Sequence, residues 1–225
     1  MKYVIANWKA HKNYQEVNEW CSVFLDKIAY SNQLQNSLKQ GRLSIIICPP
    51  DPFIALVKAR FLKTTNIFVG VQSVSQYDDG AYTGETTARM VAGVADYSLI
   101  GHSERRQLFN ETNEVIAAKT AMAFKYMITP LVCVRTIQDT IPAETTFVVY
   151  EPVWAIGTGK NEQPKAVVEM KQMLKVGPAQ KFIYGGSVTP ENCMGYLSEA
   201  AIDGILPGKA SLDPQTFYEM VSQVV

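Results

Sequence analysis

Long apolar runs are missing from this chain of 225 residues, and so is an excess of either charge. No stretch approaches the roughly 18 consecutive apolar residues that a membrane span requires, and the apolar part of the N-terminal MKYVIANWK is too short for a signal peptide. Basic and acidic residues number 21 each, which disfavours a nucleic-acid track or a membrane-surface patch. We therefore expect a cytoplasmic protein with a small-molecule partner, no nucleic acid and no membrane.

Cysteine is also scarce, and its spacing is uninformative. Cys21, Cys48, Cys133 and Cys193 are scattered without the spacing of metal ligands or of a redox pair, so we expect reduced thiols and no metal site. Cys133 lies within an apolar run, which favours a packed core thiol over a nucleophile.

Short apolar runs alternate with helical stretches along the whole chain. Eight runs predict strands buried on both faces: 3–7, 44–48, 66–71, 97–101, 128–134, 146–151, 181–184 and 203–207. Amphipathic stripes predict helices between most of them, the clearest having Tyr14, Val17, Trp20, Cys21, Phe24, Leu25 and Ile28 on one side, and Phe217, Met220, Val221 and Val224 on another. Eight strand-helix repeats favour a single closed (β/α)8 barrel, domain 1–225, over an open doubly wound sheet.

One repeat is too short for its helix. Only RTIQDTIPAETT, residues 135–146, separates the fifth and sixth strands, and Pro142 interrupts it. Two turns of about three residues each leave under two helical turns, so we expect this helix to be lost or reduced to one turn. The outer faces of both strands should then lose cover, which leaning helices or another subunit would restore.

In a barrel of this kind, chemistry belongs at the carboxyl ends of the strands. Asn7 and Lys9 follow the first strand, His102 and Glu104 the fourth, and Glu151 the sixth. Each has a structural alternative: Lys9 as a solvated lysine, His102 as a satisfied structural side chain, and Glu104 as a first-turn carboxylate favoured by the helix dipole. Because all of them follow strand ends, we favour the interpretation that they supply a base, an electrophile and a cation to one site.

Glycine-rich stretches follow the last two strands. YGGS ends with Ser187, and PGK contains Gly208. Either stretch could be an ordinary turn, but this is the place where such barrels frequently bind phosphate. Together they favour an anion site.

Six motifs now occur in the order found in one enzyme family. They are NWK at 7–9, GAYTGE at 80–85, IGHSERR at 100–106, YEPVWAIGTGK at 150–160, YGGSV at 184–188 and ASL at 210–212. The chain resembles the triosephosphate isomerase family from residue 2 to about 220. The resemblance implies a TIM barrel that interconverts two phosphorylated trioses without cofactor or metal.

The resemblance also implies a role for each catalytic candidate. Glu151 would shuttle a proton between two substrate carbons, and neutral His102 would donate to the substrate oxygens. Lys9 would offset the developing negative charge with Asn7 beside it, and Glu104 would order the cluster. A glutamate base, a neutral histidine and a closing loop are well-known features of this family, and for this chain they are implied by the resemblance alone.

Phosphate would be held, by the same resemblance, through backbone N–H groups of Gly157, Ser187, Gly208 and Lys209. The loop that begins with Pro152 would close over the substrate, excluding water from the base and from the reactive intermediate.

A homo-oligomer is implied as well, because the long loop 73–85, with Thr83 at its tip, would insert into a neighbouring subunit. Departures from the family pattern at Ala10, His11, Arg135 and Thr136 lie toward that contact and put its details in doubt. Lys209 replaces a glycine, and Pro207 replaces an aliphatic residue, without removing a catalytic group.

Two alternatives stay open. A different phosphosugar barrel enzyme such as an aldolase would need a Schiff-base lysine inside the barrel, and no strand interior offers one. A non-catalytic binding or structural descendant would be expected to have lost Lys9, His102 or Glu151, and all three are retained.

Overall fold

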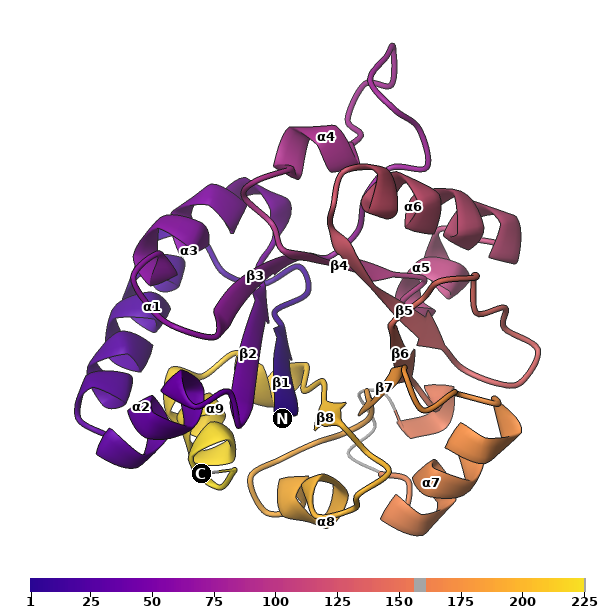
Figure 1. Cartoon of the computed structure of the whole chain (residues 1–225). Coiled ribbons are helices and arrows are strands. Elements are labelled where there is room, and N and C mark those ends of the chain that lie inside the picture. The colour runs from indigo at the N-terminus through magenta and orange to yellow at the C-terminus, as the bar shows by residue number, and fades with distance from the viewer. Residues whose placement is uncertain (156–160, 225) are drawn as a thin grey trace.

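Eight parallel strands close into a barrel in the computed structural model, which describes residues 1–155 and 161–224 (Figure 1). The strands are β1 (Lys2–Asn7), β2 (Leu43–Cys48), β3 (Ile67–Val71), β4 (Tyr97–Ile100), β5 (Thr129–Val134), β6 (Phe147–Tyr150), β7 (Lys181–Tyr184) and β8 (Gly204–Ile205). Each strand pairs with the next, and β8 pairs back to β1. The predicted (β/α)8 architecture is confirmed.

Helices surround the barrel. They are α1 (Tyr14–Ala29), α2 (Asn32–Lys39), α3 (Ile54–Phe61), α4 (Ala88–Val91), α5 (Ser103–Leu108), α6 (Asn113–Lys125), α7 (Pro164–Met173), α8 (Cys193–Leu197) and α9 (Pro214–Ser222), with short 3₁₀ helices η1 (Asp51–Phe53), η2 (Val153–Ala155) and η3 (Lys209–Ser211). None of the helices in the described ranges has a stretch long and apolar enough to cross a membrane.

Alternation along the strands separates an inner core from an outer one. Inside the barrel lie Tyr3, Ile5, Ile46, Cys48, Leu99, Leu131, Cys133, Phe147, Val149, Ile183 and Leu206. Because successive strand side chains point to opposite faces, the inner series Phe147 and Val149 continues to Glu151, and the inner series Tyr3 and Ile5 continues to Asn7. The alternation of side chains along β6 and β1 therefore places the Glu151 carboxylate and the Asn7 amide at the mouth of the barrel.

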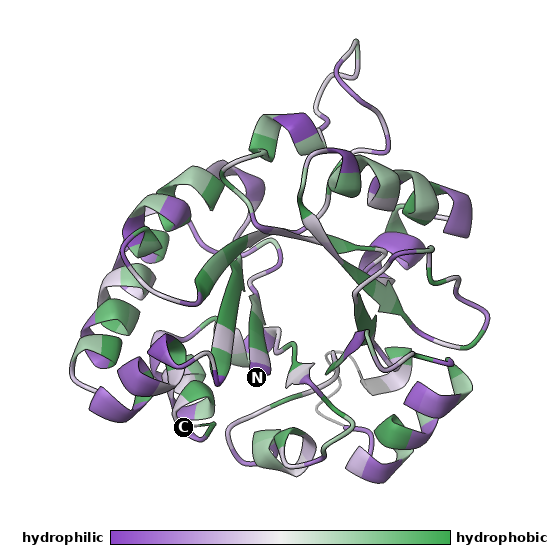
Figure 2. Cartoon of the chain, viewed as in Figure 1, coloured by the Kyte–Doolittle hydropathy of each residue, from purple (hydrophilic) through white to green (hydrophobic). Residues whose placement is uncertain are grey.

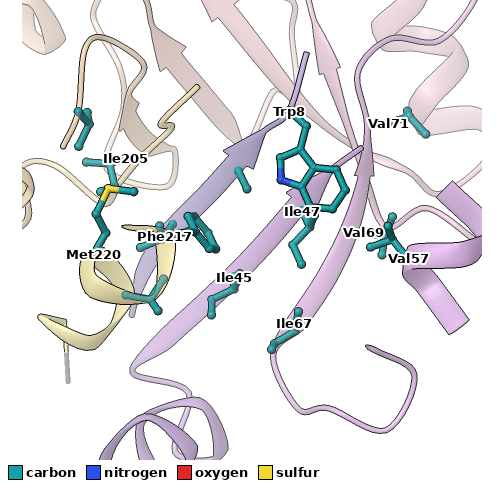
Figure 3. Packing of buried hydrophobic residues seen from close by; sticks show 14 of the residues in the cluster. Trp8, Ile45, Ile47, Val57, Ile67, Val69, Val71, Ile205, Phe217 and Met220 are labelled. Atoms are coloured by element: carbon teal, nitrogen blue, oxygen red, sulfur yellow. The ribbon is translucent and has the colours of Figure 1, made fainter. Parts of the chain in front are cut away.

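The outer core lies between the strands and the helices. Figure 2 shows hydrophobic residues along the strands and mixed faces on the surrounding helices, and Figure 3 shows side chains of α9 and α3 facing the outward residues of β2, β3 and β8. Trp20 and Phe24 of α1 contact Phe217 of α9 with ring centroids 5.8 and 5.3 Å away. One detail of the predicted stripe is wrong: Tyr14, the first residue of α1, is exposed because that turn lies beyond the edge of the core.

The connection between β5 and β6 contains no helix, as predicted. Residues 135–146, all within the described part of the chain, form turns and irregular structure (Figure 1). The expected loss of cover over these two strands is wrong, however. Their outward side chains Val132, Val134, Val148 and Tyr150 are buried in the single chain, and Ile141 of the connection packs against the same cluster. The outer faces of these two strands are therefore covered within the single chain.

Closure of the barrel supplies a test of the fold. A Cβ on Gly204 would overlap the carbonyl oxygen of Tyr3, which is paired with Gly204 in the β1–β8 ladder. We expect Gly204→Ala to destabilise the protein by about 1–3 kcal/mol or more, because the clash is with backbone that cannot rotate away. In the control Gly195→Ala, the new methyl group meets only Pro164, at 3.6 Å. Equal urea midpoints for the two variants would contradict this account.

Candidate active site

A cavity of about 1140 Å³ opens among the carboxyl ends of the strands. All but one of the predicted site residues line it: Asn7, Lys9, His102, Glu104, Glu151, Ser187, Gly208 and Lys209. The exception is Gly157, which lies outside the described residues. Residues that are far apart in the sequence thus meet in one site because parallel strands bring their carboxyl ends to the same end of the barrel.

Glu151 is fully buried at the base of this cavity. Its Oε2 accepts a hydrogen bond from the Ser103 backbone N–H at 2.8 Å, whereas Oε1 lies 3.3 Å from His102 Nε2 and has no hydrogen-bond partner among the described residues. An added Cβ on Gly185 would lie 3.0 Å from Glu151 Cγ, so the glycine leaves room for the carboxylate. A buried carboxylate with one free oxygen is prepared to accept a proton.

His102 is the N-cap residue of α5, and its ring is bonded to the helix that it precedes. The Glu104 backbone N–H donates to His102 Nδ1 at 3.2 Å, so Nδ1 carries a lone pair and the proton of the neutral ring resides on Nε2. His102 Nε2 lies 3.3 Å from Glu151 Oε1 without a hydrogen bond between them. A neutral ring in this tautomer has its Nε2–H available as a donor at the cavity.

Lys9 has an unusual backbone conformation. Its φ is 51°, in the left-handed region that non-glycine residues seldom adopt. The Lys9 N–H donates to Asn7 Oδ1 at 3.0 Å, and Gln72 Nε2 donates to the Lys9 carbonyl at 2.9 Å. Local strain of this kind persists only where the surroundings fix it, and here two side chains do so.

The head of Lys9 pairs with Glu104. Its Nζ bonds Glu104 Oε1, and Gly208 lies against its stem, since an added Cβ there would be 3.3 Å from Lys9 Cε. Glu104 thus serves two neighbours, holding the ammonium group through its side chain and the His102 ring through its backbone.

The predicted anion-binding residues lie on two adjacent loops. Ser187 follows β7, and its carbonyl accepts from Asn192 Nδ2 at 3.1 Å. Gly208 precedes η3, where Ser211 Oγ donates to the Gly208 carbonyl at 2.7 Å. Both loops line the same cavity as Glu151 and Lys9.

The second flank of the predicted lid is tied to β7 and α8. The Glu162 N–H donates to the Tyr184 hydroxyl at 2.9 Å, and the Tyr196 hydroxyl donates to the Glu162 carbonyl at 2.6 Å. The two tyrosine rings stack with centroids 4.2 Å apart. An added Cβ on Gly186 would overlap the Tyr184 hydroxyl, which accounts for a glycine at that position.

Three supporting residues escaped the sequence analysis. Ser103 lies in the GHSERR motif but acts through its backbone N–H, which no side-chain pattern reveals. Tyr184 precedes the glycine pair and could have been noticed as a polar-tipped aromatic at a strand end. Gln72 gave no signal, because its importance comes only from reaching Lys9 across the barrel.

Cys133 is buried inside the barrel, as predicted for a core thiol. Burial and the nearby negative charge of Glu151 hold the pKa of this thiol well above its usual value, so it stays protonated and weakly nucleophilic at neutral pH. Within residues 1–155 and 161–224, no group of three or more His, Cys, Asp or Glu side chains is placed to hold a metal ion.

Known proteins with similar sequences are all triosephosphate isomerases among those named below. The family model described as triosephosphate isomerase matches residues 2–224. Triosephosphate isomerase of Symbiobacterium thermophilum is 34% identical, with 95% of this chain and 93% of that protein covered. The proteins of the same name from Mesomycoplasma hyorhinis and Aquifex aeolicus are 35% and 31% identical, with 97% and 98% of each chain covered. This chain forms a closed barrel and matches the family model over nearly its whole length, so it belongs to the triosephosphate isomerase family.

Proposed function

We propose that this chain interconverts dihydroxyacetone phosphate and D-glyceraldehyde 3-phosphate by proton transfer through an enediolate. One observation carries the proposal: the buried Glu151 carboxylate and the His102 imidazole line one cavity, with Oε1 and Nε2 3.3 Å apart. A base and a hydrogen-bond donor so arranged suit proton abstraction next to a carbonyl group.

In this proposal, Glu151 removes a proton from the substrate carbon beside the carbonyl. The electron pair of that C–H bond forms the carbon–carbon double bond of the enediolate, and the π pair of the carbonyl group moves onto its oxygen. His102 gives its Nε2 proton to the former carbonyl oxygen and takes one back from the neighbouring hydroxyl oxygen, so that the hydroxyl proton moves from one oxygen to the other. Protonated Glu151 then returns its proton to the neighbouring carbon, which regenerates the carboxylate. The free oxygen of Glu151 and its single bond from the Ser103 N–H support this role, because the carboxylate has little to give up when it engages substrate.

The cation and its partner complete the electrostatic arrangement. Lys9 stabilises the negative charge of the enediolate from the side of β1, and Asn7 fixes the Lys9 backbone. Glu104 holds Lys9 Nζ until substrate arrives, and its backbone N–H keeps His102 in the donor tautomer. A pre-oriented site of this kind needs little reorganisation during reaction.

The substrate phosphate is bound, in this proposal, by backbone N–H groups of Ser187, Gly208 and Lys209, together with Gly157. Gly208 packs against the side chain of Lys9, and both line the same cavity as Glu151. A substrate whose phosphate binds at Gly208 would therefore place its carbon atoms near Glu151. The segment that follows Pro152, of which residues 156–160 lie outside the described residues, is the lid in this proposal, and Glu162 beyond it is bonded to Tyr184 and Tyr196. The cytoplasmic location stays a prediction.

Replacing the proposed base tests the mechanism. Glu151→Gln keeps the shape of the side chain and an oxygen for the Ser103 N–H but cannot take up a proton at neutral pH. We expect kcat to fall by about 10²- to 10⁴-fold, the usual worth of general-base catalysis. In a coupled isomerase assay, Glu169→Gln, which removes an exposed carboxylate on α7, should keep wild-type turnover. Wild-type kcat in Glu151→Gln would remove Glu151 from the mechanism.

Ligand binding offers a test that does not depend on turnover. 2-Phosphoglycolate carries a phosphate and a planar anionic end like the enediolate, and it should bind the native site alone. At about 100 times its Kd the free energy of unfolding should rise by about 2.7 kcal/mol, measured as an increase in Tm. Glycolate, which lacks the phosphate, serves as the control. An unchanged Tm at millimolar 2-phosphoglycolate would argue against a phosphate site.

The oligomeric state is also part of the proposal. Residues 77 and 79–85 are exposed on a loop that projects beyond α4 (Figure 1), stiffened by the stacked rings of Tyr77 and Tyr82. We propose that this loop inserts into a second copy of the chain near Lys9. Because the outward side chains of β5 and β6 are already buried in the single chain, no assembly larger than a dimer is needed to cover them.

A charge at the tip of this loop should separate the subunits. We expect Thr83→Arg to lower the mass measured by light scattering to that of a monomer and to reduce activity at nanomolar concentration, because each site loses its support. Tyr30→Arg adds the same charge at the exposed residue that follows α1 and should change neither property. A wild-type monomer with full activity at nanomolar concentration would refute the dimer.

A further inference from the structure

A buried carboxylate lies in the segment that replaces the missing helix. Asp139 Oδ2 accepts from the Arg135 backbone N–H at 2.7 Å and from Arg135 Nε at 2.9 Å, and Oδ1 accepts from Arg135 Nη2 at 2.8 Å. Its side chain is 5% exposed. Burial alone would raise the pKa of Asp139, but the hydrogen bonds from Arg135 and the charge of Arg106 outweigh it and lower the pKa. The carboxylate is therefore ionised at neutral pH.

Arg106 is the second cation at this carboxylate. Its Nη1 lies 3.5 Å from Asp139 Oδ1, and its side chain is 2% exposed. Within the described part of the chain, Asp139 is the one carboxylate that forms an ion pair with Arg106. A buried guanidinium stays charged and loses much stability when its counterion is removed.

Arg106 also clamps the active-site turn. Its Nε donates to the Gly101 carbonyl at 2.9 Å, and its Nη2 donates to the Cys133 carbonyl on β5 at 3.2 Å. Gly101 has φ 74°, and an added Cβ there would lie 3.1 Å from Nη2, so the guanidinium rests directly on this backbone. The residue after Gly101 is His102.

The clamped turn supplies several contacts of the site. Ser103 N–H holds Glu151, Glu104 N–H holds the His102 ring, and the Glu104 side chain holds Lys9. A shift of the turn would move the base, the donor and the cation relative to one another. A misplacement of about 1 Å can cost about 100-fold in rate.

We propose, on the basis of the isomerase activity proposed above, that Asp139 is a positioning residue for the reaction. It neutralises Arg106, which in turn fixes the turn from Gly101 to Glu104 and hence the distance between His102 and Glu151. The connection between β5 and β6 thus contributes to the active site although it has no helix. Its Asp139 carboxylate, held by Arg135 of the same segment, fixes Arg106 and through it the turn at the mouth of the barrel.

The test compares Asp139→Asn with wild type in kcat and KM. Asparagine keeps the size of the side chain but removes the charge, so Arg106 loses its counterion. We expect kcat to fall by about 10- to 100-fold, with KM changed by less than about threefold, because the phosphate loops lie elsewhere. Asp139→Glu, which retains the charge, should recover part of kcat. Wild-type kcat in folded Asp139→Asn would overturn the proposal.

Two controls separate positioning from loss of stability. Asp203→Asn removes a carboxylate that accepts from the Phe182 N–H at 2.9 Å near the amino ends of β7 and β8, far from the mouth. Ile141→Ala removes apolar cover from the same connection as Asp139. Both should lower Tm while leaving kcat at the wild-type value. A fall in kcat equal to that of Asp139→Asn in either control would reduce Asp139 to a structural residue.

A spectroscopic measurement keeps this proposal distinct from the isomerase activity itself. The chain has two histidines, so the imidazole ¹⁵N signals of His102 can be assigned against His11 alone. Asp139→Asn should shift the His102 Nδ1 and Nε2 signals, and Ile141→Ala should not. Unchanged His102 signals would overturn the positioning role even if wild type proves inactive, whereas an inactive wild type with shifted signals would overturn only the proposed function.

If Asp139→Asn does not fold, Asn113→Ala tests the same chain of contacts. Asn113 Oδ1 accepts from Arg106 Nη1 at 3.0 Å and from the Thr140 N–H at 3.2 Å, so its loss frees the guanidinium on the same side. A kcat lowered by about 3- to 10-fold with shifted His102 signals is expected. Wild-type values for both would count against the proposal.

Discussion

Closure of the sheet is the constraint on which the site depends. β1 pairs with β2 over six residue pairs but with β8 over only two, Tyr3 with Gly204 and Val4 with Ile205. This narrow seam turns an open parallel sheet into a ring, and in a ring all carboxyl ends face one mouth. The residues after β1 and β4 can then meet the residue after β6, although nearly 150 positions separate the first from the last.

Within that mouth, a single turn organises the chemistry. The four residues from Gly101 to Glu104 provide the imidazole, an N–H group for Glu151, an N–H group for the imidazole and a partner for Lys9. Burying a carboxylate as fully as Glu151 costs free energy unless it is bonded, and here it is bonded through one oxygen only. The role proposed for Glu151 requires such an arrangement, because a fully satisfied carboxylate would be a poor base.

The outer layer shows how a repeat can shrink without opening the core. In the connection that has no helix, Ile141 packs against the outer core cluster, and Asp139 forms ion pairs with Arg106 and Arg135. A charged group in such a place requires good partners, since desolvation opposes its burial. Arg135 and Arg106 are those partners, and both belong to segments that border the mouth.

The sequence by itself determined the eight strands, the single barrel, the absence of a helix between β5 and β6 and which residues follow each strand end. It could do so because periodicity and chain length are local properties of the backbone. The motifs also pointed to the family, which the full-length match established. Only the tertiary structure decided that the outward side chains of β5 and β6 are buried within the single chain, that Ser103 and Gln72 contact the site, and that His102 Nδ1 accepts from the Glu104 N–H. These facts depend on contacts between distant segments, which no local pattern encodes: the Glu151 carboxylate meets the Ser103 N–H across 48 positions, and Gln72 meets Lys9 across 63.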